Sequence, residues 1–189
     1  MTQMPDPAQR SATYDDLIRV PEHLVAEIID GELITSPRPA SRHARASSGL
    51  GGFLVPPFDR GDGGPGGWWI VDEPELHLGP DVIVPDLAGW RRERMPVFPD
   101  AAWFDLAPDW VCEVVSPSTG RVDRVRKMPK YAANDISHLW LIEPVLQTLE
   151  VFRLDAGTWR MVATHGGDEV VRAEPFDAIE IRLDALWIP

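Results

Sequence analysis

Hydrophobic and polar residues follow a hairpin-like pattern near the start of the chain. Thr13 is a suitable helix cap before the acidic first turn of "TYDDLIRV", and the later segment "AEIIDGELIT" has apolar residues on both sides of Asp30-Gly31. An Asp-Gly pair between two apolar runs is typical of a tight turn between antiparallel strands. We therefore expect a short helix followed by two paired strands.

The middle of the chain changes from helical to strand-like spacing. Apolar residues recur at helical spacing in "SRHARASSGLGGFLVPPF", although three glycines weaken the helix. The glycine-rich stretch "DRGDGGPGGWW" then predicts a loop. Two strand-like segments follow, "WWIVDEPELHL" and "DVIVPDLAGW", and the nearly continuous apolar run "WVCEVVSP" predicts a strand buried on both faces.

A strand–helix–strand unit and an alternating C-terminal region complete the pattern. Ser118 and Thr119 are suitable caps for a helix that runs toward Asn134, after which "SHLWLIEP" predicts another buried strand. The remaining residues alternate and contain turn signals at Asp155-Ala-Gly157 and Gly166-Gly167, so we expect an antiparallel meander there.

These elements predict an α+β, or mixed α/β, fold with a central mixed β-sheet flanked by helices and with C-terminal antiparallel strands. The length of 189 residues suits a single domain over residues 1–189, of which we expect residues 1–12 to be flexible. The chain contains no apolar run long enough to span a membrane and no signal-peptide pattern at its start. We therefore expect a soluble, cytoplasmic protein with no membrane partner.

The charge balance argues against ordinary nucleic-acid binding without excluding it. The net charge is −12, whereas proteins that bind phosphate backbones usually carry clustered Lys and Arg. A nuclease needs only a local basic surface, and some of the acidic groups could be metal ligands. Five basic residues do gather within ten positions, namely Arg121, Arg124, Arg126, Lys127 and Lys130.

Two carboxylates occupy unusual surroundings. Asp86 follows a run of Val and Ile, and Glu113 lies in the apolar segment "VCEVV". A buried carboxylate is costly unless it is paired or bound to a cation, although an aspartate at a strand end can also simply serve a turn. Placed on neighbouring strands, the two residues could supply hard oxygen ligands to Mg²⁺ or Mn²⁺.

The distribution of lysine adds a third candidate. Of the 18 basic residues, 16 are arginine, and the only lysines are Lys127 and Lys130. A lysine near a metal site could position or deprotonate the attacking water or stabilise charge on phosphate, and arginine cannot accept a proton. The alternative is that the two lysines lie close together by chance.

Other reactive residue types give weaker signals. The single cysteine, Cys112, excludes an internal disulfide and is expected in the core. The histidines show no paired metal-binding spacing, and His43 is expected to be a solvated surface residue rather than a substrate contact. The eight tryptophans are expected in the core and on sheet faces rather than as platforms for stacking bases.

Several segments together resemble a known family. The segments "AEIIDGELITSPRPASRH", "PDLAGW" and "EVVSPSTGRVDRVRKMPKYAANDISHLWLIEP", with the C-terminal alternation, are similar to the "putative restriction endonuclease" family of the PD-(D/E)XK nuclease superfamily. The resemblance covers most of the chain. It implies a restriction-endonuclease-like core and hydrolysis of phosphodiester bonds in DNA with Mg²⁺ or Mn²⁺.

The resemblance also implies roles for particular residues. Asp86 matches the aspartate of the "PD" motif, and Glu113 matches the second acidic ligand. The wider superfamily carries a lysine two residues after that acid, where this chain has Val115. The family moves this lysine to the following helix, where Lys127 matches and Lys130 is the competing candidate.

The resemblance also implies two further residues at the site. Ser116 could hold the strand end or a water molecule, and Glu27 matches an N-terminal glutamate that can approach the metal site. Pro129 departs from a regular helix, so the helix either begins near Met128 or bends there, and this choice sets the direction of Lys127.

Three functions remain open from the sequence. The first is a metal-dependent endonuclease in which Asp86, Glu113 and Lys127 act on DNA, and in which the arginines at 121, 124 and 126 contact backbone phosphates. The second is a binding or assembly protein that keeps the nuclease fold without turnover. The third, a carboxylate-based hydrolase of other substrates, lacks a nucleophile motif. A homodimer is expected, because cutting two strands often needs two active sites.

Overall fold

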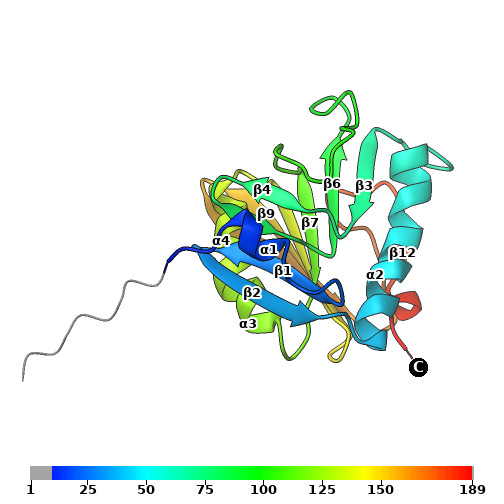
Figure 1. The fold of residues 1–189 in the computed structure, drawn as a ribbon. Helices are drawn as coiled ribbons and strands as arrows, with labels where there is room; N and C mark the ends of the chain where they lie inside the picture. Colours follow the sequence, from blue (N-terminus) through cyan, green and yellow to red (C-terminus); the bar gives the residue numbers. More distant parts are fainter. Residues whose placement is uncertain (1–9, 189) are drawn as a thin grey trace, which may run out of the picture.

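The computed structural model describes residues 10–188, which form two main β-sheets with helices against them (Figure 1). In chain order the elements are α1 (Tyr14–Leu17), β1 (Leu24–Ile29), β2 (Glu32–Pro37), α2 (Ser41–Leu54), the π-helical turn η1 (Val55–Arg60), β3 (Trp68–Asp72), β4 (Leu76–Leu78), β5 (Asp81–Ile83), β6 (Leu87–Arg91), β7 (Trp110–Val114), α3 (Gly120–Val122), the π-helical segment η2 (Asp123–Lys127), α4 (Met128–Ala133), β8 (His138–Glu143), β9 (Thr148–Asp155), β10 (Thr158–Gly166), β11 (Val170–Val171), β12 (Ile181–Arg182) and the 3₁₀ turn η3 (Leu183–Leu186).

The larger sheet is mixed, as the sequence predicts. Its strand order is β10-β9-β8-β7-β6-β3. Strands β7 and β8 are parallel, and all other neighbouring strands of this sheet are antiparallel. Parallel neighbours need a crossover connection, and the helical segment from α3 to α4 provides it. The α+β fold class and the central position of Glu113 on β7 are therefore confirmed.

The N-terminal hairpin is also confirmed. β1 and β2 are antiparallel neighbours with Ile29 opposite Glu32, and the turn between them uses positive φ angles of 56° at Asp30 and 75° at Gly31. Positive φ at both central positions is what Asp-Gly favours. The expected flexibility of residues 1–12 stays a prediction: residues 1–9 lie outside the described residues, and the Ala12 N–H donates to the Gly31 carbonyl at 2.7 Å.

Two segments that the sequence predicts as single strands are each divided between the sheets. "WWIVDEPELHL" becomes β3 in the six-stranded sheet and β4 in the four-stranded sheet, whose order is β2-β1-β5-β4. "DVIVPDLAGW" becomes β5 and β6 in the same two sheets. Prolines cause the division, since Pro74 and Pro85 lack the N–H that an uninterrupted ladder needs. The result is a hairpin that bends from one sheet into the other.

The prediction of a C-terminal antiparallel meander is confirmed only in part. β9 and β10 form the expected hairpin, with a register shift between Met161 and Ala163. The following strands β11 and β12 pair with each other in a separate two-stranded sheet.

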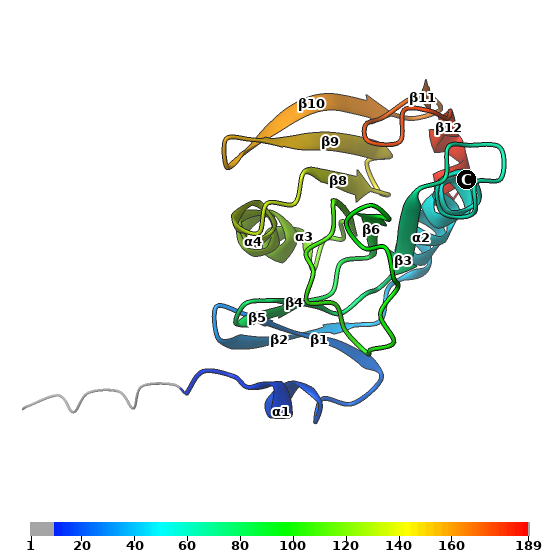
Figure 2. The same cartoon turned by 90° about the horizontal axis from the view of Figure 1, so that it is seen from above.

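Apolar side chains cover both faces of the six-stranded sheet. On one face, Leu50 and Leu54 of α2 share a cluster with Cys112 and two buried tryptophans, Trp110 and Trp140. The opposite face contacts α4 through Tyr131 and the small sheet through Ile29. Figure 2 shows α3 and α4 lying between the two sheets, with α2 on the other side of the large sheet.

The core predictions for cysteine and most tryptophans are confirmed. Cys112 is fully buried and five tryptophans, at positions 68, 90, 110, 140 and 187, are buried, whereas Trp103 is 37% exposed on the loop before β7. Among residues 10–188, no helix has the length and apolar character of a membrane-spanning segment.

Replacing Leu50 by alanine should test the packing of α2. Its side chain is fully buried in the cluster, so Leu50→Ala is expected to lower the free energy of unfolding by about 2–5 kcal/mol. The matched control is Leu146→Ala, at a leucine that is 72% exposed, with an expected change within about 0.5 kcal/mol. Urea denaturation measures both, and equal effects would contradict this account of the core.

Candidate active site

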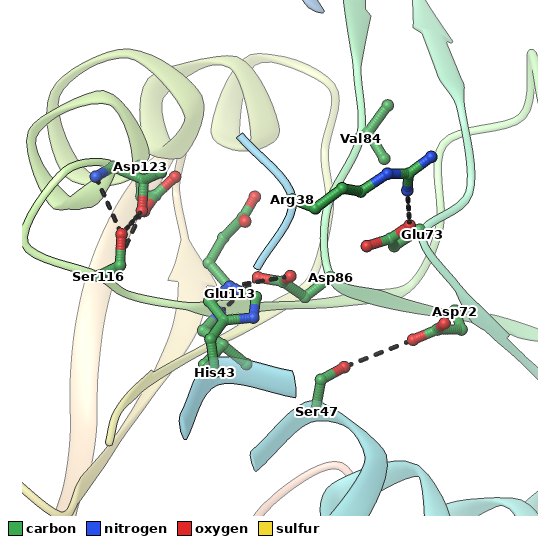
Figure 3. A network of polar contacts seen from close by, with 12 residues as sticks. Arg38, His43, Ser47, Asp72, Glu73, Val84, Asp86, Glu113, Ser116 and Asp123 are labelled. Atoms are coloured by element: carbon green, nitrogen blue, oxygen red, sulfur yellow. Dashed lines mark hydrogen bonds and ion pairs between the residues drawn. The ribbon is translucent and has the colours of Figure 1, made fainter. Parts of the chain in front are cut away.

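The bend of the hairpin between the two sheets opens a cavity of about 320 Å³. The end of β7, the start of α2 and the helical crossover close its other sides (Figures 1 and 3). Its lining includes five carboxylates, namely Glu27, Glu73, Asp86, Glu113 and Asp123. The same lining contains Arg38, Lys127 and His43 as potential cations and Ser116 as a hydroxyl. The cavity therefore has an excess of acidic groups.

Asp86 is held in place by the strand beside it. It follows Pro85 at the bend, and its Oδ2 accepts a hydrogen bond of 2.7 Å from the Val114 N–H at the end of β7. Its Oδ1 lies 3.2 Å from Nε2 of His43, and the two side chains point toward each other (Figure 3). One oxygen thus fixes the carboxylate to the sheet, and the other faces the cavity.

Glu113 is buried against the helical crossover. Tyr131 Oη donates a hydrogen bond to Glu113 Oε1, and Lys127 Nζ lies 3.3 Å from Oε1 and 3.4 Å from Oε2. Burial raises the pKa of Glu113 well above its usual value, against the lowering effect of Lys127. The pKa of Tyr131 is also raised, first by burial and then by the charge of Glu113.

Lys127 is the centre of a buried ionic cluster, which we define as Glu27, Glu113, Asp123 and Lys127. Its Nζ lies 2.8 Å from Glu27 Oε1 and 3.8 Å from Asp123 Oδ1, and it donates to the Val84 carbonyl at 3.1 Å. Burial lowers the pKa of Lys127, but attraction to the three carboxylates outweighs burial and raises the pKa. Lys127 is therefore protonated, and its charge is shared among three carboxylates. Because Glu113 receives only part of that charge, the effect of burial prevails and its pKa is raised.

The helix around Pro129 resolves the direction of Lys127. The π-helical segment η2 ends at Lys127, and α4 begins at Met128 with Pro129 in its first turn. The last π-helical hydrogen bond runs from the Met128 N–H to the Asp123 carbonyl, immediately before Pro129, which has no N–H to donate. The helical path continues from η2 into α4 without a break, and the Lys127 side chain lines the cavity.

Glu27 and Asp123 complete the ionic cluster from two other elements. Glu27 on β1 also accepts a hydrogen bond of 2.9 Å from the Val84 N–H, so it connects the small sheet to the bend. Asp123 lies at the start of η2, and burial raises its pKa to about 6. Asp123 could not be singled out from the sequence, because its burial depends on contacts between distant segments.

The prediction that His43 is a solvated surface residue is wrong. Its side chain is only 13% exposed and lies against Asp86. Burial lowers the pKa of His43, but the hydrogen bond and negative charge of Asp86, with smaller contributions from Asp123 and Glu73, raise it overall. Within residues 10–188, its buried Nδ1 has no hydrogen-bond partner. Its position in the first turn of α2 carries no sequence signal for this contact.

Ser116 lines the cavity, but the remaining basic candidates lie elsewhere. Ser116 Oγ lies 3.0 Å from both the Ser118 and the Thr119 hydroxyl, at the end of β7. Lys130 instead pairs with Asp30 at 2.5 Å and Asp81 at 2.9 Å, outside the lining.

The three predicted phosphate-binding arginines do not line the cavity. Arg124 pairs with Glu150 at 2.8 Å, and Arg126 pairs with Glu32 at 2.7 Å and also donates to the Ile29 carbonyl at 2.6 Å. Arg121 is exposed. Their contact with DNA stays a prediction.

The donor set is compatible with a cation that needs few protein ligands. Within the described part of the chain, no three His, Cys, Asp or Glu side chains form a ready metal-binding group. Asp86 and Glu113 nevertheless supply two carboxylates in one acidic cavity, and Mg²⁺ is commonly held by one or two carboxylates together with water and substrate oxygens.

The fold and the cavity define a mixed-sheet protein with a carboxylate and lysine site at the end of its central strands. A family model described as "Putative restriction endonuclease" (Uma2) matches residues 12–185, so the chain belongs to this family. The fold is similar to the crystal structure of a "putative nuclease belonging to DUF820" from Anabaena variabilis ATCC 29413. The TM-score is 0.73 at 22% identity, over 93% of this chain and 97% of that one. No curated protein matches the sequence.

The raised pKa of Asp123 leads to a pH prediction. Since the folded protein binds this proton more tightly than the unfolded chain, the contribution of Asp123 to stability falls as pH rises from about 4 to 6. Between these two limits the contribution of Asp123 to the free energy of unfolding changes by about 3 kcal/mol. Asp123→Asn should remove this part of the slope, measured by guanidinium denaturation with EDTA at several pH values. Parallel pH profiles for the two proteins would contradict the assignment.

Proposed function

We propose that the protein is a metal-dependent endonuclease that hydrolyses phosphodiester bonds in DNA. The observation that carries the proposal is the meeting of Asp86, Glu113 and Lys127 in one cavity, although they come from three separate elements. Membership of a family described as "Putative restriction endonuclease" supports the same reaction class.

Asp86 and Glu113 would hold Mg²⁺ or Mn²⁺, with Glu27 beside them as an acidic neighbour. A cation held there would supply Lewis-acid polarisation of a phosphate oxygen. Glu113 is bonded to Lys127 and Tyr131, which fixes its carboxylate without using every lone pair. Asp86 keeps Oδ1 directed away from the sheet ladder, since only Oδ2 accepts the Val114 N–H.

Lys127 would act through its charge. A lysine with a raised pKa cannot accept a proton from water at neutral pH, so the role of general base is disfavoured. The ammonium can instead stabilise negative charge that develops on the phosphoryl group. Glu27 and the Val84 carbonyl orient this ammonium toward Glu113. Ser116, at the same end of β7, would hold a water molecule.

A second candidate is a nuclease fold that binds without turnover. Both oxygens of Glu113 already contact Lys127, and Val115 stands where the wider superfamily has its lysine. These contacts leave Glu113 fewer free lone pairs for a cation than an unpaired carboxylate has. The metal titration below separates the two functions.

Titration calorimetry with Mg²⁺ and Mn²⁺ tests the proposed metal site. The unmodified protein should bind metal, alone or with an oligonucleotide duplex present, and Asp86→Asn or Glu113→Gln should abolish the binding signal because each removes a carboxylate ligand. Glu93→Gln is the matched control at an exposed glutamate outside the cavity lining and should bind like the unmodified protein. Absence of binding in both conditions would favour the second candidate.

A DNA-cleavage assay with the Lys127→Met variant tests the role of the Lys127 ammonium. The variant should cleave a supercoiled plasmid about 100-fold more slowly or worse, since a charge aimed at the developing anion is lost. Circular dichroism should first establish that the variant is folded, because three buried carboxylates lose their counter-ion. Cleavage at the normal rate by the folded variant would refute the assigned role.

A further inference from the structure

Among the described residues, three potential cations line the cavity, namely Arg38, His43 and Lys127. Lys127 is buried and already shared among carboxylates, and His43 is largely covered. Arg38 also lines the cavity, and its side chain is 58% exposed. Arg38 is therefore the permanently charged cation of the lining that an incoming anion can contact.

The chain around Arg38 restricts where the side chain points. Arg38 lies between Pro37, the last residue of β2, and Pro39, just before α2. A proline has a fixed φ and also limits the residue before it to extended conformations. The segment "SPRPAS" therefore carries the guanidinium past the end of the small sheet, and Figure 3 shows it extended toward Glu73 at the bend.

The present partners of Arg38 are exchangeable. Its Nη1 lies 3.3 Å from Glu73 Oε2, and its Nη2 donates to the Glu22 carbonyl at 3.0 Å. The Glu73 side chain is 35% exposed, and ion pairs exposed to water contribute little to stability. A guanidinium has five N–H donors, so it can keep the Glu22 carbonyl while a phosphate takes the place of Glu73.

Glu73 is tied to the same bend as the candidate metal ligand. Its N–H donates to the Asp86 carbonyl at 3.1 Å, and its φ angle is 44°, in the left-handed region that non-glycine residues seldom adopt. The backbone of Glu73 is therefore held beside that of Asp86, and Arg38, Glu73 and Asp86 all line the cavity. An anion that replaces Glu73 would lie next to the proposed reaction centre.

We infer that Arg38 binds a backbone phosphate of the nucleic-acid substrate at the cavity mouth and that Glu73 occupies this position on Arg38 when substrate is absent. The inference rests on the proposed function and deepens it by naming a substrate-binding residue outside the basic segment 121–130. Glu73 then competes with the phosphate for Arg38, and the exposure of the pair makes this exchange possible.

The test is DNA binding as a function of salt concentration, measured by fluorescence anisotropy with a labelled duplex and with Ca²⁺ in place of Mg²⁺. Arg38→Ala should weaken binding about tenfold at 0.1 M salt, the scale of one lost charge-assisted contact. It should also reduce the slope of log K against log salt by about 0.9, which corresponds to one phosphate contact. Arg38→Lys should keep the slope while losing part of the affinity, because lysine keeps the positive charge but lacks the paired N–H donors of the guanidinium.

Arg153→Ala is the matched control. Arg153 forms a similarly exposed ion pair, with Glu174 at 3.1 Å and with 48% of its side chain exposed, and it does not line the cavity. Its replacement should leave both affinity and slope unchanged. Equal behaviour of Arg38→Ala and Arg153→Ala, with normal DNA binding by the unmodified protein, would overturn the inference alone.

Glu73→Gln separates substrate binding from a structural role of the ion pair. If Glu73 competes with phosphate, Glu73→Gln should strengthen DNA binding, and the gain should disappear when Arg38 is also replaced by alanine. If the pair only shapes the cavity, both single variants should weaken binding, which would overturn the inference. Failure of the unmodified protein to bind or cleave DNA with any divalent cation would overturn the proposed function together with the inference.

Discussion

The placement of Lys127 among three buried carboxylates determines how the two sheets and the helical crossover meet. Its ammonium contacts Glu27 from the small sheet, Glu113 from the large sheet and the Val84 carbonyl at the bend. Three ammonium donors match these three acceptors, whereas a planar guanidinium would need a wider space. In an arginine-rich chain, this geometry gives a physical reason for lysine at position 127. Removing one member of such a cluster leaves buried charge without a partner, which typically costs 3–5 kcal/mol.

The same arrangement explains why the cavity lies at the bend. Pro74 and Pro85 interrupt two strands that would otherwise stay in one sheet, and the interruption exposes backbone groups that side chains then satisfy. Glu27 accepts the Val84 N–H, and Asp86 accepts the Val114 N–H. Each carboxylate is thus bound to the fold by one oxygen. The two carboxylates that accept the unpaired strand N–H groups, Glu27 and Asp86, therefore also line the cavity.

The sequence predicts the parts of the site whose signal is local. Glu113 is detectable because it interrupts an apolar strand, and Asp86 because it follows one. His43, Asp123 and Arg38 are not detectable in this way, since their importance arises from partners in distant segments: His43 meets Asp86, and Arg38 meets Glu73. The basic segment likewise gives no local signal of its partners in the fold. Arg126 is paired with Glu32, 94 positions away, so a cluster of positive charge in the sequence is largely neutralised in the fold.

Charge also constrains the order of events at the proposed site. Five carboxylates line the cavity, against two side chains that are permanently cationic. A phosphodiester would meet net repulsion there, and the low dielectric of a partly buried cavity strengthens that repulsion. Burial raises the pKa of Glu113 and of Asp123, and the neighbouring carboxylates raise both further against the lowering effect of Lys127, so protons relieve the repulsion at low pH. At neutral pH a divalent cation is the species that relieves it, so cation binding should precede the approach of DNA. An acidic protein can then act on an acidic polymer without a broad basic surface.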